Sequence, residues 1–459
     1  MNNEETRLTK APIPVVLVRK LLHRRATTHL GRILSKAYPV DAARLFTSLG
    51  SAERSQVFSI LLAECDASHV AAVLTEMPTE DSAMLLSRLA PKRIAELLSE
   101  MSADDATPLA SRLQEPLAAQ VLALMEAEPA ADVRELLEHE EQTAGRIMTP
   151  DYFALEEERT VSDAITALQQ RSAELEMVFY LYVVDKRDHL VGVLSLRKLL
   201  TTPPVERLKN VMVPNVISAK TDADQEEVAR LVAEYNLLAL PIVNDDDKLV
   251  GIVTVDDVID VLQDEVAEDL LALAGVATEE HVSTSAARSL RLRAPWLLVN
   301  LVTAFLAASV VSLFEVQIGN LPRLAVFMPI VAGMGGNAAT QTLTVIIRGI
   351  ALGEMGAVSW VTIKAIIVGA GNGLINGLAA AAVAGLFYKD VRLGLVLGAA
   401  MVTNMIVASI AGTLIPVGLK KVRIDPAVAS SVFVTTCTDV AGFFSFLGLA
   451  TLFMKFLQP

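Results

Sequence analysis

Histidine, cysteine and, over the last third of the chain, charge are scarce in this sequence of 459 residues. All six histidines precede residue 288, so the C-terminal part offers no imidazole ligands for zinc or copper. Two separated cysteines, Cys65 and Cys437, argue against a disulfide framework. The opening "MNNEETRLTK" has no apolar stretch, so we expect no secretory signal. The sequence shows no nucleophile–base set, phosphate loop or histidine cluster, and we therefore expect no enzyme.

Charge divides the chain into two unlike parts. Residues 288–459 contain 12 Lys and Arg and 5 Asp and Glu, which gives a net charge of +7. Since the whole chain has a net charge of −14, residues 1–287 have a net charge of −21. The acidic part has the composition of a soluble protein. The other part contains five apolar runs, at 296–314, 324–347, 365–388, 393–419 and 426–454, and only Asp439 interrupts the fifth. Each reaches about the 20 residues that cross a bilayer, so we expect an all-α membrane domain of five transmembrane helices.

Basic residues at the ends of these runs predict their orientation. With the N-terminus inside, the inner flanks hold Arg288, Arg291, Arg293, Arg348, Lys364, Lys420, Lys421 and Arg423. The outer flanks hold Arg323, Lys389, Arg392 and Lys455. The excess on one side predicts a cytoplasmic N-terminal part, residues 1–287, and a C-terminus outside.

Polar groups interrupt the apolar runs. The second run contains "GMGGNAATQTLT" (333–344), where glycines bare the backbone beside amides and hydroxyls, as in a helix that lines a polar cavity. The third contains "GAGNGLINGLAAAAVAG" (369–385), whose small residues favour close helix packing, and the fourth contains Asn404. The fifth, "SSVFVTTCTDVAGFFSFLGLATLF" (430–453), holds a single charge, Asp439.

A lone carboxylate at membrane depth costs about 2.5 kcal/mol or more, so Asp439 is a candidate functional residue. Carboxylates, amides, hydroxyls and carbonyls are hard oxygen donors, which suit Mg²⁺, Ca²⁺ or Mn²⁺. Mg²⁺ gives up its water reluctantly and touches few carboxylates directly, so one aspartate per chain suits this ion. A structural hydrogen bond or a proton relay are the alternative roles for Asp439.

An internal repeat occupies residues 147–262. "HLVGVLSLRKLL" (189–200) matches "KLVGIVTVDDVI" (248–259), and "IMTP" (147–150) matches "VMVP" (211–214). Each copy predicts a helix, two strands ("FYLYVVD" with "LVGVLSL", "LALPIVN" with "LVGIVTV") and a second helix. The repeat resembles a pair of CBS domains, which are α/β modules. The resemblance implies one nucleotide site, because Gly251, Thr254 and Asp257 match the family's adenine-nucleotide pattern whereas Lys198 replaces the acid in the first copy.

Two further segments of the acidic part are helical. "EMPTEDSAMLL" (76–86) and "EMSADDATPLA" (100–110) form a repeat of 24 residues, which predicts stacked short helices with Thr79 or Ser102 as caps. "VDDVIDVLQDEVAED" (255–269) contains seven acids and no base. Like charges one turn apart repel, so we expect divalent cations to neutralise this helix, unless it is simply a solvated face. Such a helix would sense cytosolic divalent cation.

The order of these segments, with "PIVAGMGGNAATQTLTVIIRGIALGE" (329–354) and "TDVAGFFSFLGLA" (438–450), resembles the MgtE family of bacterial Mg²⁺ channels. The resemblance implies a homodimer in the inner membrane with a pore between subunits. It also implies that cytosolic Mg²⁺ closes the pore by bridging the acidic domains. We accordingly predict an N-terminal segment (1–29), a superhelical N domain (30–138), two CBS domains (139–202 and 203–262), an acidic connecting or plug helix (263–287) and a pore domain (288–459).

The resemblance also assigns residues. The predicted Mg²⁺ ligands are Asp439 in the pore and, as cytosolic sensor acids, Asp104, Glu226, Asp256, Asp257, Asp260, Glu265, Glu268 and Asp269. The predicted pore lining is Gly333, Gly335, Gly336, Asn337, Gln341 and Thr435. Thr254 and Asp257 are the predicted contacts for ATP or another adenine nucleotide. Mn²⁺, Co²⁺ and Ca²⁺ are further candidate ions, and we expect no nucleic-acid partner.

Three residues depart from the family pattern. Ala339 stands where the family commonly has glycine, and Asn236 and Pro108 stand where some members carry sensor acids. Two other functions remain open on the sequence: an exchanger that couples divalent cations to Na⁺ or H⁺, and a membrane-anchored nucleotide or ion sensor without transport.

Overall fold

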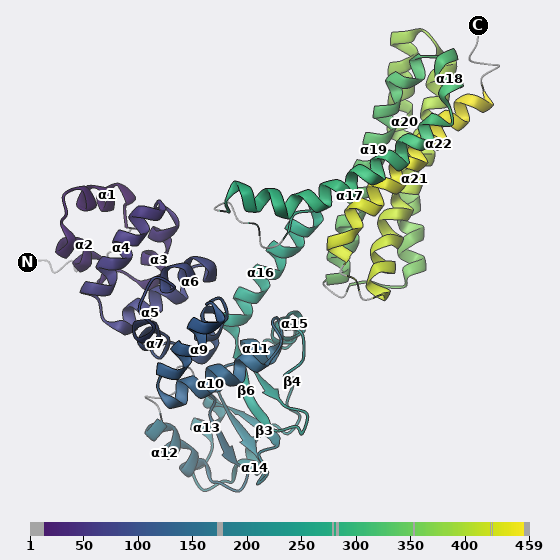
Figure 1. The fold of residues 1–459 in the computed structure, drawn as a ribbon. Helices are drawn as coiled ribbons and strands as arrows, with labels where there is room; N and C mark the ends of the chain where they lie inside the picture. The colour runs from purple at the N-terminus through teal and green to yellow at the C-terminus, as the bar shows by residue number, and fades with distance from the viewer. Residues whose placement is uncertain are drawn as a thin grey trace, which may run out of the picture. The chain divides into compact units, whose positions relative to one another are not determined.

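The computed structural model in Figure 1 describes residues 13–453 except 172–177, 278–279, 281–283, 352–353, 423 and 425. Arg423 and Lys455, which contributed to the predicted orientation, lie outside the described residues, as do residues 1–12 of the predicted N-terminal segment. The chain forms two compact units, residues 1–262 and 263–459. The first combines the helical and CBS-like segments, and most of the second consists of long apolar helices.

Ten short helices build the first part of unit 1 (Figure 1). They are α1 (Val15–His23), α2 (Thr27–Leu34), α3 (Pro39–Thr47), α4 (Ser51–Glu64), α5 (Ala67–Thr75), α6 (Thr79–Leu86), α7 (Pro91–Leu98), α8 (Ala103–Ser111), α9 (Glu115–Leu124) and α10 (Ala127–Glu138). Their starts follow local chemistry: Asp66 accepts a hydrogen bond from the His69 amide (3.1 Å), and proline opens α3 and α7. Of the two predicted caps, Ser102 occupies the N-cap position of α8 but makes no side-chain capping bond, whereas Thr79 is already the first residue of α6.

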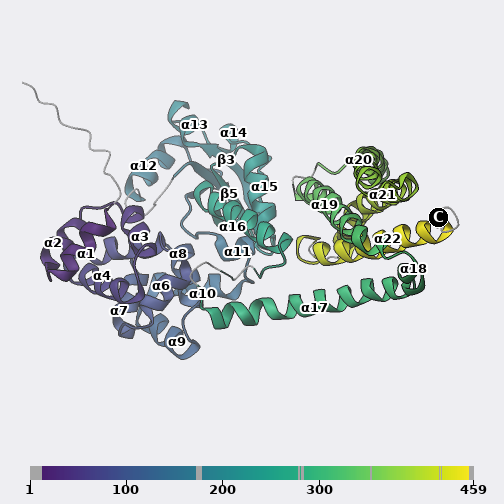
Figure 2. The ribbon, with the colours of Figure 1, turned by 90° about the horizontal axis from the view of Figure 1, so that it is seen from above.

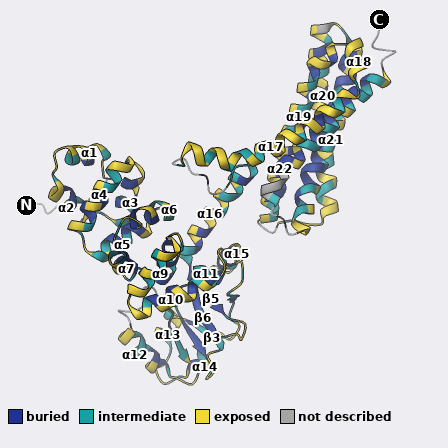
Figure 3. Cartoon of the chain, in the orientation of Figure 1, coloured by how far each residue is buried: buried dark blue, intermediate teal, exposed yellow. Residues whose placement is uncertain are grey.

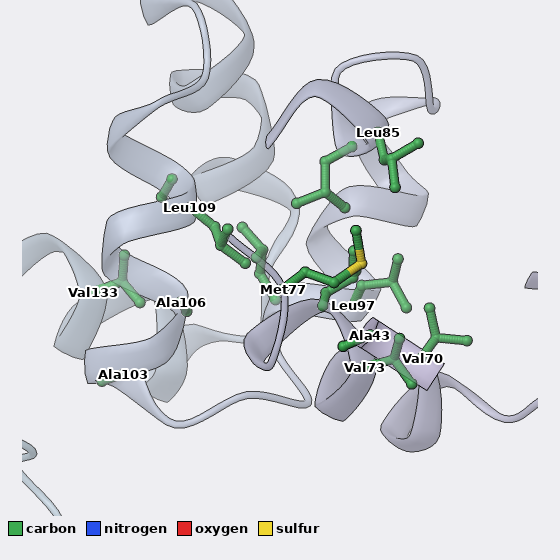
Figure 4. Packing of buried hydrophobic residues seen from close by; sticks show 14 of the residues in the cluster. Ala43, Val70, Val73, Met77, Leu85, Leu97, Ala103, Ala106, Leu109 and Val133 are labelled. Atoms are coloured by element: carbon green, nitrogen blue, oxygen red, sulfur yellow. The ribbon is translucent and has the colours of Figure 1, made fainter. Parts of the chain in front are cut away.

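Helices two apart in the sequence pack together and share one core. α3 packs on α5, α5 on α7, α7 on α9, and α6 on α8. Figure 4 shows buried side chains of this core, among them Val70 on α5, Met77 between α5 and α6, Leu97 on α7 and Leu109 on α8. Each fully buried side chain of this kind stabilises the fold by about 1.5–3 kcal/mol. The predicted superhelical stack of short helices is confirmed.

Two three-stranded sheets follow, one for each sequence repeat. The first has the order β1 (Ala154–Glu156), β2 (Tyr180–Val184), β3 (Leu190–Ser195), and the second has β4 (Ala219–Lys220), β5 (Ala239–Val243), β6 (Leu249–Thr254). In each sheet the first strand is parallel and the last antiparallel to the middle strand, with Leu155 opposite Val183 and Leu240 opposite Val253. The flanking helices are α11 (Ala144–Ile147), α12 (Val161–Arg171), α13 (Leu196–Thr201), α14 (Leu208–Val211) and α15 (Gln225–Tyr235). The predicted hairpins are confirmed, whereas β1 and β4 were not predicted.

The two repeats exchange their leading segments. Thr149, which precedes the first sheet, pairs with Ile252 of the second through bonds of 2.8 and 3.0 Å. Val213, which precedes the second sheet, pairs with Val193 of the first through bonds of 3.1 and 3.0 Å. Each leading segment therefore completes the sheet of the other repeat.

Methionine and glycine fix this exchange. Met148 lies over Gly251, where an added Cβ would approach its Sδ to 2.6 Å, and Met212 lies over Gly192, where the corresponding distance would be 2.3 Å. The methionine and the glycine that recur in the two repeats thus form the same contact in each sheet, Met148 with Gly251 and Met212 with Gly192. Glycine is needed at both positions because its hydrogen leaves room for the methionine side chain.

One helix, α16 (Val255–Leu273), crosses the predicted boundary at residue 262. It begins directly after β6 and carries all seven acids of the connecting segment. The expected helix over 263–287 is therefore the second half of a longer helix that ends at Leu273, and the described residues between 274 and 285 are not helical.

Unit 2 contains five helices long and apolar enough to cross a membrane within the described ranges. They are α17 (Ala286–Ser312), α19 (Arg323–Ala351), α20 (Val358–Tyr388), α21 (Val391–Lys421) and α22 (Pro426–Leu452), with the short α18 (Glu315–Asn320) after α17. The five predicted spans are confirmed, and α18 was not predicted. α21 contacts α19, α20 and α22 and is the most buried of them, whereas α17 is mostly exposed in the single chain (Figures 2 and 3).

Small residues bring α20 and α21 into backbone contact. A Cβ added at Gly373 would lie 2.7 Å from the Cα of Val402, and one added at Gly377 would lie 2.8 Å from the carbonyl oxygen of Gly398. Neither position has space for a larger residue. The packing role predicted for the small residues of the third span is confirmed.

Candidate functional site

The polar segment of α19 forms one face of that helix. Gly333, Asn337 and Gln341 are exposed in the single chain, together with Thr340 and Thr344, and their spacing of three or four residues places them on one side. The opposite side, which includes Val331, faces the other helices of the unit and is buried. The predicted pore-lining residues Gly333, Asn337 and Gln341 thus share an uncovered face, and Gly336 at its edge is partly covered.

Gly335 lies elsewhere than predicted. It is buried on the packed side of α19, where an added Cβ would lie 2.2 Å from Nδ2 of Asn404 on α21. A residue two positions from both Gly333 and Asn337 points about 200° away from them. Gly335 is therefore a packing glycine in this chain, and its absent side chain accommodates Asn404.

Asp439 lies in the middle of α22, one turn after Thr435. Thr435 is exposed and Asp439 is half-buried, and the spacing of four places them on the same face. Within the described part of the chain no side chain or backbone group forms an ion pair or hydrogen bond with the Asp439 carboxylate. α22 packs against α19, the helix with the polar face. Among the described residues, Asp439 therefore has no partner for the structural hydrogen bond that was its alternative role.

Asn404 was noted in the sequence without a role, and the structure places it between the two helices just described. It is 1% exposed, and its Nδ2 donates a hydrogen bond to the Val331 carbonyl oxygen on α19 (2.8 Å). A Cβ added at Gly442 on α22 would lie 2.8 Å from the same nitrogen. A buried asparagine in an apolar run was the available signal, but its partners lie 73 and 38 positions away in the sequence.

A second cluster, in unit 1, is made of acids. Asp104 and Asp105 are in the first turn of α8, and Asp256 and Asp257 are in the first turn of α16. The negative charges of Asp104, Asp256 and Asp105 all act on the Asp257 carboxyl. The first turns of α8 and α16 therefore lie close together. We call these four residues the acidic junction.

The acidic junction disfavours ionised carboxylates. Burial, reinforced by the negative charge of Asp104, raises the pKa of Asp257 to about 7. Burial, with a smaller contribution from Asp151, also raises the pKa of Asp104. The Oδ1 atom of Asp104 is buried and accepts no hydrogen bond from the described residues. An orphaned carboxylate oxygen beside a second carboxylate fits a bound cation, which would supply both the missing partner and the missing positive charge.

The other predicted sensor acids lie on α15 and farther along α16. Glu226 is exposed in the first turn of α15, and Asp260, Glu265, Glu268 and Asp269 follow along α16. Over the described ranges, no group of three or more His, Cys, Asp or Glu has the arrangement of a metal site. Since Mg²⁺ keeps several waters and is often held by one or two carboxylates, a pair such as Asp104 and Asp257 still suits it. These assignments stay predictions.

The predicted nucleotide residues are adjacent at the end of β6. The Thr254 hydroxyl donates a hydrogen bond to the Asp257 carboxylate, and both side chains are largely covered. Asp257 thus belongs both to the nucleotide pattern and to the acidic junction. In the first repeat, Ser195 instead accepts a hydrogen bond from the Lys198 amide (3.3 Å) at the start of α13.

Two of the three residues that depart from the family pattern, Asn236 and Ala339, have local structural roles. Asn236 ends α15 in the left-handed conformation (φ 53°), which asparagine adopts more readily than most residues. Ala339 is buried against α21, where a Cβ added at Gly412 would lie 2.8 Å from the Ala339 carbonyl oxygen. Pro108 lies within α8. α19 and α21 therefore pack closely at Ala339.

Comparison with known proteins agrees with this architecture. Residues 328–449 match the MgtE model, described as a divalent cation transporter, residues 37–142 match the MgtE intracellular N domain, and residues 144–203 and 208–264 match CBS domains. The chain is 37% identical to the magnesium transporter MgtE of Enterococcus faecalis over 71% of its own length and 72% of the relative. It is also 37% identical to that of Thermus thermophilus, over 71% and 73%.

A solved structure extends the comparison to the fold. The crystal structure of the cytosolic domain of the Mg²⁺ channel MgtE in complex with ATP is 36% identical, with a TM-score of 0.50 over 54% of this chain and 100% of that one. The helical domain and the CBS pair of this chain thus share their fold with the cytosolic domain of that channel. This chain belongs to the MgtE family of divalent cation transporters.

Proposed function

We propose that this chain forms a homodimeric Mg²⁺ channel that imports the ion across the bacterial inner membrane and closes when cytosolic Mg²⁺ is abundant. The relatives named as magnesium transporters support the ion, and the solved cytosolic domain of a Mg²⁺ channel supports the class. In this proposal residues 1–287 are cytoplasmic and the C-terminus lies outside, as the basic flanks predict.

The observation that carries the proposal is the environment of Asp439. A half-buried carboxylate that has no ion-pair or hydrogen-bond partner among the described residues lies on α22, and the neighbouring helix α19 presents Asn337 and Gln341 on an uncovered face. A second copy that covers these faces would enclose a polar path with one Asp439 from each subunit. Two carboxylates and several amide and hydroxyl oxygens suit an ion that passes with most of its water.

Mg²⁺ is the cargo, and the side chains act on its water shell. Asp439 accepts hydrogen bonds from metal-bound water and neutralises the charge of the ion. The Oδ1 of Asn337, the Oε1 of Gln341 and the hydroxyl of Thr435 accept further hydrogen bonds from the same shell. Mg²⁺ keeps its water shell, because the protein ligands would not offset the energy of removing that water. Ion selection then depends on how well the spacing of these acceptors fits a compact hydrated ion.

Closure by cytosolic Mg²⁺ is supported by the acidic junction. Asp104 on the N domain and Asp257 on the second CBS domain repel each other at neutral pH unless a cation lies between them. Binding of Mg²⁺ would hold the two domains together, and its loss would release them. The acids farther along α16, with Glu226, are the remaining candidates for sensing.

Nucleotide binding is a second proposed activity of the cytosolic unit. The related cytosolic domain was solved in complex with ATP, and Thr254 and Asp257 match the nucleotide pattern here. Asp257 would then contact either a ribose hydroxyl or a cation. We therefore expect ATP and cytosolic Mg²⁺ to influence each other's binding.

The test is Mg²⁺ entry into proteoliposomes that contain the purified full chain, with Mg²⁺ varied on the cytosolic face. We expect passive entry that falls as cytosolic Mg²⁺ rises, and loss of entry in Asp439→Asn. Glu315→Gln, which removes an exposed acid at the start of α18, is the control and should conduct normally.

Three results would contradict the proposal. Undiminished entry through a normally folded Asp439→Asn would exclude the assigned pore site. Entry that requires an opposing Na⁺ or H⁺ gradient would identify an exchanger, and no entry under any condition would favour a sensor without transport.

A further inference from the structure

Asn404 is a polar residue at the centre of the helices of unit 2. Its side chain is almost fully buried, and only one end of the carboxamide is satisfied: Nδ2 donates to the Val331 carbonyl oxygen at 2.8 Å. The Oδ1 atom is buried and receives no hydrogen bond from the described residues. An unpaired buried acceptor is expensive, and more so at membrane depth where bulk water is absent. A leucine or alanine would fill this position without that cost.

Two glycines on different helices make the space for this side chain. A Cβ added at Gly335 on α19 would lie 2.2 Å from Nδ2 of Asn404, and a Cβ added at Gly442 on α22 would lie 2.8 Å from it. Both distances are below 3.0 Å, so a side chain at either glycine would displace the Asn404 carboxamide. The carboxamide therefore occupies the volume that side chains would take on both neighbours, and α19 and α22 meet across it.

The two glycines adjoin the residues that the proposed function places in the pore. Gly442 is three residues after Asp439, nearly one turn along α22. Gly335 is two residues before Asn337 and so lies on the side of α19 opposite the polar face. Slipping either helix by one residue would displace its side chains by about 1.5 Å along the axis and rotate them by about 100°. The contacts of Asn404 fix that register for both helices.

We propose that Asn404 is a positioning residue for ion selection, which holds α19 and α22 in the register that spaces Asn337 from Asp439. The inference rests on the proposed function, because it assumes that these two residues meet the hydrated ion. The hydrogen bond to Val331 gives the contact a direction that apolar packing lacks. Asn404 itself never touches the ion.

The experiment measures Mg²⁺ and Ca²⁺ entry into proteoliposomes at a series of ion concentrations for Asn404→Ala, Gly335→Ala, Gly442→Ala and the double variants that combine Asn404→Ala with each glycine change. Gly448→Ala on α22 and Gly371→Ala on α20 are matched controls, because a Cβ at either position meets nothing within 4 Å. Folding is followed by size-exclusion chromatography and thermal unfolding.

We expect Asn404→Ala to fold, because it removes the orphaned oxygen together with the bond. It should raise the half-saturating Mg²⁺ concentration and lower the Mg²⁺ to Ca²⁺ preference, each by about five- to tenfold, while the maximal rate changes little. Gly335→Ala and Gly442→Ala should fold poorly because of the clash. Adding Asn404→Ala should restore their folding but leave the altered preference.

A purely structural role predicts lower thermal stability of Asn404→Ala with unchanged half-saturation and ion preference, and that result would overturn the inference. Failure of the double variants to fold better than the single glycine variants would overturn the assigned contact. Asp439→Asn in the same series separates the two hypotheses. If Asp439→Asn conducts normally, the proposed function fails; if it does not conduct while Asn404→Ala conducts like the original chain, only this inference fails.

Discussion

Neutralising Asp257 should stabilise unit 1 when no divalent cation is present. The Asp257→Asn change keeps the shape of the side chain and an acceptor for the Thr254 hydroxyl, but removes the charge that burial and Asp104 oppose. Because the folded pKa is raised above 3.8, the folded unit holds a proton that the unfolded chain has released. The contribution of Asp257 to the free energy of unfolding of unit 1 is therefore largest at low pH and is lost as pH rises through about 7.

The size of the effect follows from the same pKa. The pKa of Asp257 rises from 3.8 to about 7, and each pKa unit corresponds to about 1.36 kcal/mol. Ionising Asp257 well above pH 7 therefore costs the folded unit at most about 4 kcal/mol. Partial exposure of the carboxylate reduces this, and we expect about 1–2 kcal/mol to be measurable. For a unit of this size such a gain raises the melting temperature by about 3–6 °C.

The native Cys65 provides the assay. It is partly buried beside α4 in unit 1, and in a Cys437→Ala background it is the sole cysteine of the chain. Thermal unfolding of the full chain in detergent is followed by labelling of this thiol, in EDTA and in Mg²⁺, at pH 6 and pH 8. Asp246→Asn, which removes an equal charge from the exposed turn between β5 and β6, is the matched control.

We expect Asp257→Asn to melt about 3–6 °C above the Asp246→Asn control in EDTA at pH 8, with the difference shrinking at pH 6 and in Mg²⁺. Without the substitution, the chain in EDTA should become more stable between pH 8 and pH 6. The reasoning is refuted if the two variants melt together at pH 8, or if the parent chain shows no such pH dependence.

Three further predictions test the acidic junction, the CBS pair and the packing of α20 on α21. Asp104→Asn should raise, severalfold, the cytosolic Mg²⁺ concentration that suppresses ion entry into proteoliposomes, and equal suppression in the variant and the parent would exclude Asp104 as a sensor. Gly251→Ala should destabilise the CBS pair by about 1–3 kcal/mol through overpacking against Met148, seen as a lower melting temperature that Met148→Ala in the same chain partly restores. Gly377→Leu should separate α20 from α21 and abolish the folded peak in size-exclusion chromatography, whereas Gly385→Leu, where a Cβ meets nothing within 4 Å, should leave it intact.

Patterns local in sequence predicted much of this fold. Apolar runs of membrane length became α17, α19, α20, α21 and α22, and the repeated strand pairs became the two hairpins. Both signals depend only on the period of the side chains along one element. They could not predict β1 and β4, because strands of three and two residues carry too little pattern and form by pairing with distant partners.

The sites were predicted unevenly for the same reason. Asp439 could be identified from the sequence, because a single charge in an apolar run is a local signal that does not depend on distant residues. Gly335 was misplaced because the glycines of "GMGGN" look alike in sequence, and only the contact with Asn404 shows which of them faces inward. The proximity of Asp104 and Asp257 depends on how α8 meets α16, and the sequence pattern of either helix carries no information on that.

The exchange of leading segments between the two CBS repeats has a consequence for the integrity of the chain. Neither repeat contains all the backbone partners and core contacts that its own sheet requires, since Thr149 and Met148 serve the second sheet and Val213 and Met212 the first. A chain cut between the repeats, near residues 203–207, would leave two fragments that each expose an unpaired strand edge. Such fragments should reassociate when produced together and aggregate when produced alone, so the pair behaves as an intertwined heterodimer that happens to be covalently joined.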